Sequence, residues 1–379
     1  MVRIIGAKLL RFFLSWLKLL CIDDKKIILF SYQGRGVNCN PKYLTKYLVR
    51  EKAKKHLHIN IYFAVSDKNK IAGMSSENVN FIKYGGLKFL YHMATAKVVV
   101  TNSSNLPWFP YKKNQILINT WHGGGAYKSE WYNLKLTKFK NERVDYFVSS
   151  SRVFTKLLSK STGLAEEKFI CTGMPRNDVM FNKSIQQKKE LHCRYGLPLN
   201  YRYLLYAPTY RDDNTDYPYP NFGEILQAME TKFGGKWKLL VRGHYNLSGS
   251  FSDVNDCTIY RDMSEIDDMQ DVLMISDAVI TDYSSLIWDY SFLYRPCFLY
   301  VPDMKDYARV RGFYYPLSSW GFPYAENMSA MIKVINDFDE VDFYKSMKKH
   351  HEKMGSFEEG TASQRVGCLV LKHLRGDKK

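Results

Sequence analysis

The chain has 379 residues, which is more than one ordinary domain needs and enough for two domains of roughly 150–200 residues. Its formal net charge of +17 favours an anionic partner, such as an acidic membrane, a polyphosphate compound or nucleic acid. The seven cysteines show no CxxC pair and no zinc-ligand spacing. This favours reduced cytosolic thiols over a disulfide framework and argues against a structural zinc site.

Residues 3–20 predict a basic amphipathic helix that lies on an anionic membrane surface. At about 100° per residue, one arc carries Arg3, Lys8, Arg11, Ser15 and Lys18, and large apolar residues fill the opposite side. The charges of Arg11 and Lys18 argue against both a secretory signal and a transmembrane span. An ordinary helix packed on its own domain core is the remaining alternative.

Short apolar runs alternate with helical stretches from residue 26 onward, and the alternation restarts after a polar segment at 182–193. Strands are expected at 26–32, 59–65, 98–101, 115–120, 145–149, 169–172, 203–207, 237–242, 257–260, 278–281 and 297–301. This pattern predicts two Rossmann-like α/β domains with parallel sheets, which bind ligands in a cleft beyond the carboxyl ends of the strands. The expected divisions are a helix at 1–22, domains at 23–193 and 194–340, and closing helices at 341–379.

Two predicted strands end in a histidine. The stretch QILINTWHGGGAYK, residues 115–128, brings His122 to a strand end beside three glycines, and KLLVRGH, residues 238–244, does the same for His244. A histidine titrates near neutrality and can take a proton from a hydroxyl group, while glycines let the backbone approach a ligand closely. A structural histidine beside a tight turn is the alternative in each case.

Two further stretches could bind phosphate. In AVITDYSSLIWD, residues 278–289, Asp282 or Ser284 could cap a helix whose start, with the hydroxyls of Ser284 and Ser285, would hold a phosphate group. Simple N-capping without a ligand is equally consistent with this stretch. In YAPTYR, residues 206–211, Arg211 could clamp a diphosphate, although a solvated arginine is the commoner outcome.

The acidic clusters do not predict a metal site. Asp212, Asn214 and Asp216 resemble the start of a calcium loop, but Tyr217 stands where that loop requires glycine. The aspartates at 267, 268 and 271 are expected on a solvated helix face. We therefore expect no metal and no bound cofactor.

Taken together and in this order, these motifs resemble the CDP-glycerol:poly(glycerophosphate) glycerophosphotransferase family of teichoic acid synthesis. The resemblance covers roughly residues 27–330 and includes SYQGRGVNCNPKYL (31–44), TNS (101–103), TWHG (120–123), DYFVSSS (145–151), TGMPRND (172–178), YAPTYR, RGH, SDAVITDYSSLIWDY (276–290), RP (295–296) and RGFYY (311–315). It implies a GT-B-like fold, a membrane-associated helical element, and transfer of glycerol phosphate from CDP-glycerol with release of CMP.

The resemblance also implies roles for individual residues. His122 matches the proposed general base, and His244 matches a histidine proposed to stabilise the donor diphosphate. The implied donor-binding set is Thr209, Arg211, Gly243, Thr281, Asp282, Ser284, Ser285 and Asp289, and the implied acceptor-side loop carries Gly123, Gly124, Gly125 and Lys128. Gly124 and Gly125 replace a Thr-Pro pair that is usual in the family, which leaves the polyol and the acceptor open.

The expected partners are CDP-glycerol or a related CDP-polyol, a lipid-linked glycan or polyol-phosphate acceptor, and an anionic membrane. The expected location is the cytoplasmic face of a bacterial cell membrane, with peripheral attachment. The alternatives are a GT-B glycosyltransferase or a CDP-ribitol ribitolphosphotransferase on the same scaffold, a non-catalytic membrane scaffold, and, more remotely, a basic nucleic-acid-binding protein. No recognised nucleic-acid motif is present, so no nucleic acid partner is expected.

Overall fold

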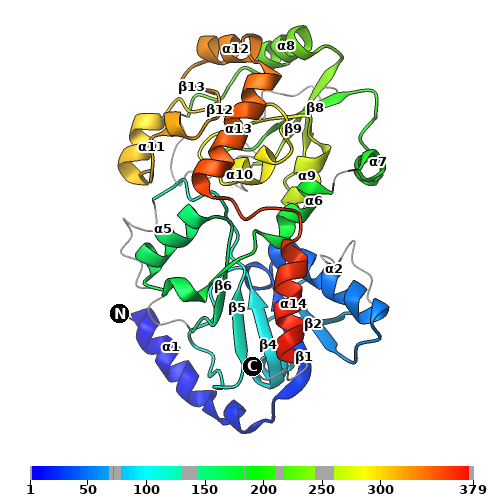
Figure 1. Cartoon of the computed structure of the whole chain (residues 1–379), viewed down its shortest axis with the longest axis vertical. Coiled ribbons are helices and arrows are strands. Elements are labelled where there is room, and N and C mark those ends of the chain that lie inside the picture. Colours follow the sequence, from blue (N-terminus) through cyan, green and yellow to red (C-terminus); the bar gives the residue numbers. More distant parts are fainter. Residues whose placement is uncertain are drawn as a thin grey trace. The chain divides into compact units, whose positions relative to one another are not determined.

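The computed structural model describes residues 2–67, 71, 78–129, 143–182, 184–209, 217–243 and 260–374 (Figure 1), without the side chains of residues 2–5, 7 and 8. Contacts between Cα atoms divide the chain into two compact units. Unit 1 comprises residues 1–122, 136–178 and 357–379. Unit 2 comprises residues 123–135 and 179–356.

Unit 1 contains a parallel sheet with the strand order β3-β2-β1-β4-β5-β6-β7. The strands are β1 (Asp23–Phe30), β2 (Asn60–Val65), β3 (Asn80–Lys83), β4 (Ala96–Thr101), β5 (Ile116–Asn119), β6 (Tyr146–Ser149) and β7 (Phe169–Cys171). The apolar second half of β1 is fully buried, as expected for a strand inside a parallel sheet. The chain order reverses between β1 and β4, which is where sheets of this type bind ligands.

Helices of unit 1 pack around this sheet. They are α2 (Cys39–Lys54), α3 (Leu87–Thr95), α5 (Arg152–Thr162) and α14 (Ala362–Leu374), and α6 (Asp178–Phe181) lies where the chain leaves the unit. Helix α14 comes from the end of the chain and packs against α2, β1 and β4 (Figure 1). Gly367 lets the two helices approach closely, because a Cβ atom there would lie 2.3 Å from the ring of Tyr47.

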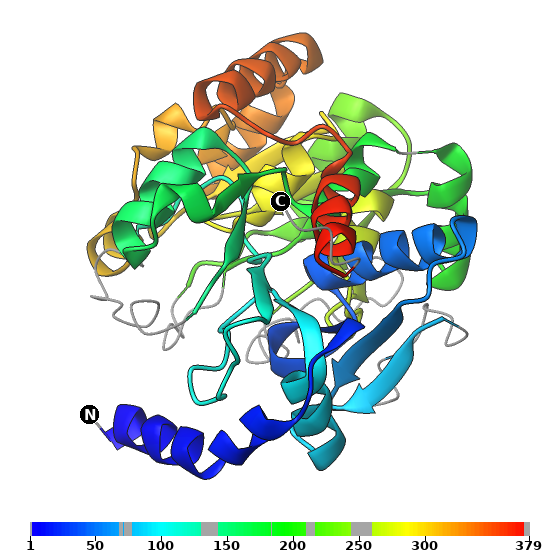
Figure 2. The same ribbon diagram turned by 60° about the horizontal axis from the view of Figure 1, so that its bottom comes forward.

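The first residues of the chain are helical, as predicted, but in two pieces. Helix α1 (Val2–Phe13) is followed by a 3-10 turn, η1 (Ser15–Leu19). Figure 2 shows α1 extending beyond the sheet of unit 1. Leu17 of η1 is buried in the core cluster of unit 1, whereas Phe12 and Phe13 are 74% and 70% exposed. The 3-10 turn η1 therefore packs on its own unit, α1 exposes apolar side chains, and the membrane-surface role of the segment stays a prediction.

Unit 2 contains a second parallel sheet with the strand order β10-β9-β8-β11-β12-β13. The strands are β8 (Arg202–Tyr206), β9 (Trp237–Val241), β10 (Tyr260–Asp262), β11 (Ala278–Thr281), β12 (Cys297–Tyr300) and β13 (Tyr324–Ala325). The chain order reverses between β8 and β11, so this sheet has a switch point like that of the first sheet. The fold class of two parallel-sheet α/β units is therefore confirmed.

The helices of unit 2 are α7 (Ile185–Arg194), α8 (Phe222–Phe233), α9 (Met269–Ile275), α10 (Leu286–Ser291), α11 (Met304–Val310), α12 (Met328–Asn336) and α13 (Glu340–Met354). Asp268, expected on a solvated helix face, is instead a buried N-cap of α9 that accepts a hydrogen bond from the N–H of Gln270. A cap satisfies backbone donors that the first turn of a helix leaves unpaired.

The division of the chain differs from the expected boundaries. The chain leaves unit 1 after Asp178 rather than after residue 193, because α7 packs against α9 and Lys188 forms an ion pair with Asp277 at 2.5 Å. The two closing helices also separate, since α13 belongs to unit 2 and α14 to unit 1. Strand β10 is found at Tyr260–Asp262, whereas residues 257–259 of its predicted range lie outside the described residues.

Candidate functional site

His122 lies at the carboxyl edge of the unit 1 sheet, just after β5. Trp121 adopts a φ of 52°, in the left-handed region, which turns the chain sharply at the strand end. The His122 Nδ1 atom lies 2.8 Å from the backbone carbonyl oxygen of Asn102, at the end of β4. A carbonyl oxygen can only accept, so Nδ1 is the donor and, in the neutral imidazole, Nε2 is the nitrogen that can take up a proton. This is the tautomer that a general base requires.

Two buried side chains fix the backbone around His122. Asn40 donates from Nδ2 to the carbonyl oxygens of Thr120 and Trp121, at 2.8 Å each, and its Oδ1 accepts the N–H of Arg176. The Arg176 guanidinium donates from Nη1 to the carbonyl oxygen of His122 at 2.6 Å and is only 4% exposed. The imidazole is therefore carried by a backbone held from both sides.

Asn102 connects the switch point of the unit 1 sheet to the histidine. Its side-chain oxygen accepts the N–H of Tyr32, which follows β1, at 2.8 Å, while its backbone oxygen accepts from His122. The Tyr32 ring centroid is 5.5 Å from that of the imidazole. Strands β1, β4 and β5 thus converge on one half-buried histidine at the position where a ligand is expected.

Asn40, Asn102 and Arg176 were not singled out from the sequence. All three lie within motifs that carried the family resemblance, but no role followed from the motifs alone. Asn40 and Arg176 are 136 residues apart in the chain, so no spacing rule connects them. Membership of a recurring motif was the only signal that could have found them.

In unit 2, Thr209 and Asp282 meet across the switch point between β8 and β11. The Thr209 N–H donates to both carboxylate oxygens of Asp282, at 2.8 and 3.0 Å, and its hydroxyl donates to Oδ1 at 2.6 Å. Thr281 donates its hydroxyl to the carbonyl oxygen of Ala207 at 2.6 Å. Asp282 is 1% exposed. These predicted donor-binding residues lie together, with their polar groups ordering the strand ends.

The serines of the third motif lie at the same edge. Ser284 and Ser285 are half-buried, and α10 begins directly after them. Asp282 does not cap this helix, because its carboxylate accepts from Thr209. The Ser284 hydroxyl lies 3.4 Å from the N–H of Leu286. Helix α10 has only six residues, so the two hydroxyls, rather than a long helix dipole, are the polar feature of this edge.

The remaining predicted residues are distributed as follows. Asp289 is 3% exposed and accepts a hydrogen bond from Gln270 at 3.0 Å, which places it inside unit 2. Gly243 follows β9 and donates its N–H to the Ser264 hydroxyl at 3.2 Å. The glycines at 123–125 and Lys128 form the first part of unit 2. Arg211 and His244 lie outside the described residues, so the roles predicted for them stay predictions.

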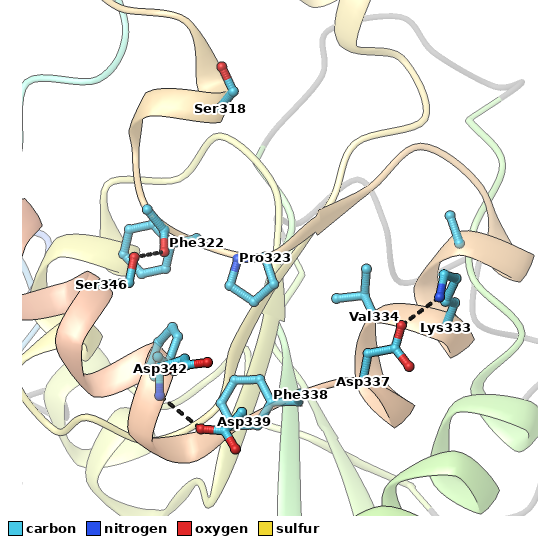
Figure 3. A pocket seen from close by; sticks show the side chains of 13 residues that line it. Ser318, Phe322, Pro323, Lys333, Val334, Asp337, Phe338, Asp339, Asp342 and Ser346 are labelled. Carbon is cyan, nitrogen blue, oxygen red and sulfur yellow. Dashed lines mark hydrogen bonds and ion pairs between the residues drawn. The ribbon is translucent and has the colours of Figure 1, made fainter.

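A groove of about 570 Å³ in unit 2 lies between α12, the start of α13 and the segment before β13 (Figure 3). None of the predicted site residues lines it. Its acidic groups have local partners: Asp337 pairs with Lys333 at 2.6 Å, and Asp339 caps α13 by accepting the N–H of Asp342 at 2.8 Å. We assign this groove no part in the reaction.

Within the described ranges, no group of three or more His, Cys, Asp or Glu side chains could hold a metal ion. The cysteines there, at positions 21, 39, 171, 193, 297 and 368, carry free thiols. None of the described helices has both the length and the apolar character needed to cross a bilayer.

Comparison with known proteins gives one family. Residues 10–372 match the model of the CDP-Glycerol:Poly(glycerophosphate) glycerophosphotransferase family. A teichoic acid poly(glycerol phosphate) polymerase of Bacillus spizizenii is 28% identical, with 91% of each chain covered. A teichoic acid ribitol-phosphate primase of the same species is 25% identical, covering 94% of this chain and 93% of the relative. The solved structure of the wall teichoic acid polymerase TagF superposes with a TM-score of 0.84 at 24% identity, covering 98% of this chain and 94% of that one, which shows a shared GT-B-like fold.

Proposed function

Because the chain belongs to the CDP-Glycerol:Poly(glycerophosphate) glycerophosphotransferase family, we propose that it transfers glycerol phosphate from CDP-glycerol to a hydroxyl of a lipid-linked or polymeric cell-surface glycan, releasing CMP. Membership makes the chain a polyol-phosphate transferase of teichoic acid biosynthesis. The identity of the polyol and the acceptor is our proposal. The observation that supports the transfer reaction is the His122 imidazole. Its Nδ1 proton is bound to the Asn102 carbonyl oxygen, so Nε2 can accept a proton.

The proposed reaction is one in-line displacement. The acceptor hydroxyl gives its proton to His122 Nε2 while its oxygen attacks the β-phosphorus of CDP-glycerol. The bond between that phosphorus and the bridging oxygen breaks, and CMP leaves with the bonding electrons. Phosphoryl transfer depends mainly on positioning and on stabilisation of charge, so no covalent intermediate with the protein is needed.

The donor side of the proposal rests on the second sheet. The hydroxyls of Ser284 and Ser285 are the described donors that would contact the diphosphate, and Thr209 is ordered beside them by Asp282. His244 and Arg211 follow β9 and β8 in the sequence, and we assign to them the neutralisation of the charge that develops on the departing CMP. Glycine residues 123–125 and Lys128 are assigned to the acceptor side.

Attachment to an anionic membrane surface is the second part of the proposal. Exposed Phe12, Phe13 and Trp16 lie near exposed Arg11 and Lys18, which is the composition of a helix that binds in a lipid interface. A lipid-linked acceptor would be met at the cytoplasmic face of the membrane. Vesicle flotation should show binding to anionic but not zwitterionic vesicles, and a Phe12→Ser, Phe13→Ser double variant should lose it. Ile185→Ser, at an equally exposed position of unit 2, is the control.

Nucleotide release separates the proposed reaction from its alternatives. The protein is incubated with a lipid-linked disaccharide acceptor and with CDP-glycerol, CDP-ribitol or UDP-sugars, and free nucleotide and product mass are measured. We expect CMP and a glycerol-phosphate product. A preference for CDP-ribitol, which the ribitol-phosphate primase relative makes the second candidate, would correct the polyol. Release of UDP alone would contradict polyol-phosphate transfer.

The role of His122 is tested by replacing it with alanine. Loss of a general base costs about 10²–10⁴ in rate, so His122→Ala should reduce kcat by that factor. His58→Ala removes an exposed histidine from the same unit and should retain wild-type kcat. Wild-type turnover in His122→Ala would end the assignment of the base.

A further inference from the structure

The loop that follows His122 is docked into unit 2, although His122 itself belongs to unit 1. Residues 123–129, here called the glycine loop, form an antiparallel bridge between Lys128 and Phe313. The N–H of Tyr314 donates to the carbonyl oxygen of Tyr127 at 3.0 Å, and the N–H of Ser129 donates to that of Gly312 at 3.1 Å. The backbone of the loop is therefore paired with unit 2 immediately after the proposed base.

Tyr127 anchors this loop in the interior of unit 2. Its side chain is 4% exposed, its ring centroid lies 4.5 Å from that of Trp320, and its hydroxyl shares a 2.8 Å hydrogen bond with Nε2 of His350 on α13. Burial raises the pKa of Tyr127 well above its usual range and lowers the pKa of His350 to about 4. Both groups are thus neutral near pH 7, and the hydrogen bond joins two uncharged, buried partners.

Glycine is required where the loop passes α10. A Cβ atom on Gly124 would lie 2.2 Å from Cδ1 of Trp288, a fully buried side chain of α10. Gly125 has a φ of 78°, in the left-handed region that favours glycine, and a Cβ there would lie 2.2 Å from the Tyr127 ring. The two glycines that replace the usual Thr-Pro pair are therefore dictated by two aromatic side chains of this chain.

We propose that Tyr127 and His350 are positioning residues for the transfer reaction, acting through the glycine loop on His122. His122 is bonded to Gly123, the first residue of the docked loop. The docking therefore determines where the chain that carries the base joins unit 2. The inference rests on the proposed function for its catalytic consequence. Tyr127 and His350 are assigned no contact with substrate, whereas residues 123–125 and Lys128 of the loop are assigned to the acceptor side, so the expected effect is on the rate of transfer and not on the binding of CDP-glycerol.

The first test removes only the anchoring hydroxyl. Tyr127→Phe keeps the ring packing but leaves His350 Nε2 without its partner, and a base displaced by a fraction of an ångström loses about 10-fold or more in kcat. The KM for CDP-glycerol should stay within twofold. Tyr203→Phe is the matched control, because Tyr203 is equally buried in unit 2 and donates its hydroxyl to the carbonyl of Pro198 at 2.8 Å. It should lower thermal stability comparably and keep wild-type kcat.

Hydrogen exchange reports on the docking without depending on activity. In Tyr127→Phe the amides of Ser129 and Tyr314, which pair the loop with unit 2, should exchange faster, whereas the core amides of β8 should not change. Wild-type exchange together with wild-type kcat would overturn the proposal. Faster exchange in a protein that transfers no polyol phosphate would overturn the catalytic role and the proposed function together, and would confirm only the anchor. Faster exchange with an unchanged kcat would overturn the positioning role while sparing the proposed function.

A rescue experiment addresses the glycine contact. Gly124→Ala should reduce kcat because the new methyl group collides with Cδ1 of Trp288, and Trp288→Ala should relieve the collision because it removes that atom with the rest of the indole ring. We expect the double variant to exceed Gly124→Ala in kcat at least fivefold, a non-additive result that neighbours in contact produce. A double variant as slow as, or slower than, Gly124→Ala would contradict docking of the loop on α10.

Discussion

The carboxyl edges of the two sheets are organised by groups of opposite character. In unit 1, the amide of Asn40 and the guanidinium of Arg176 hold the backbone that carries His122. In unit 2, the carboxylate of Asp282 holds Thr209 through three hydrogen bonds. A carboxylate and a phosphate oxygen can both only accept, so Asp282 is suited to ordering Thr209 rather than to contacting a diphosphate. Residues that order a sheet edge, such as Arg176 and Asp282, are therefore distinct from residues that would contact the substrate.

Among the residues that order the two sheet edges, Arg176→Met should have the largest effect. The carbonyl of His122 loses a charged donor, and hydrogen bonds to charged groups contribute about 1.5–3 kcal/mol. We expect kcat for CMP release to fall by about 100-fold, since small displacements of a base have effects of that size. Arg176→Lys, which keeps a cation, should lose less. A wild-type kcat in Arg176→Met would remove this residue from the site.

Acid should weaken unit 2 through two adjacent buried histidines, whereas in the described part of unit 1 it is the single His92 whose pKa burial lowers to about 4. Burial lowers the pKa of His350 to about 4 and, with the neighbouring His350, that of His351 to about 3. Their stabilisation is present above the unfolded pKa near 6.5 and is lost as pH falls toward the folded values. Urea unfolding at pH 7 and 4.5 should differ by about 2–3 kcal/mol per histidine.

The control for this acid effect is a variant that lacks the titrating groups. His350→Gln with His351→Gln should be less stable at pH 7, but its stability should change less between pH 7 and 4.5. Ser291, which shares a 2.7 Å hydrogen bond with His351, remains available to a glutamine amide. An equal pH dependence in wild type and variant would assign the acid sensitivity to other groups.

Asp282→Ala should loosen the unit 2 edge. Thr209 would lose the acceptor of its N–H and hydroxyl, and a buried donor without a partner costs about 1–3 kcal/mol. Because the proposed donor site is built there, we expect the KM for CDP-glycerol to rise about 10-fold with a smaller change in kcat. An unchanged KM with a reduced kcat would instead place Asp282 close to the transferred group.

Asn102→Ala should have the smallest effect. It tests whether the backbone of Asn102, rather than its side chain, holds the proton on Nδ1 of His122. The backbone oxygen, not the side chain, accepts from His122, so the variant keeps the contact that sets the proton on Nδ1. Only the hydrogen bond to the Tyr32 N–H is lost, and one such bond contributes about 0.5–1.5 kcal/mol. We expect kcat within about threefold of wild type and an unchanged pH–rate profile. A shifted profile would mean that the side chain tunes the imidazole.

Much of the fold could be predicted because its signals are local. Apolar runs such as the one at 278–281 match β11 directly. The short strands β3 and β13 were missed, since four and two residues carry too little pattern to recognise. The boundary after Asp178 and the return of α14 to unit 1 depend on packing between distant segments, which no local pattern encodes.

The same distinction between local signals and contacts of distant residues applies to the site. His122 was predicted because it ends a strand and precedes three glycines, which is visible within a few residues. Its supports were not predicted, because Asn40 bonds to Thr120 from 80 residues away, and Tyr127 bonds to His350 across 223 residues. For Arg211 and His244 the predictions stand as the sequence made them.

The position of α14 has a consequence for how the protein folds during synthesis. This helix packs on β1 and β4, yet it is made only after the whole of unit 2 has been translated. Residues 179–356 can collapse as one nearly continuous stretch, whereas the first sheet must wait for residues 362–374 to leave the ribosome before its core is covered. Contacts between such distant segments form slowly and leave apolar surface exposed in the meantime. Unit 1, whose synthesis begins first, is therefore the later of the two units to complete its core.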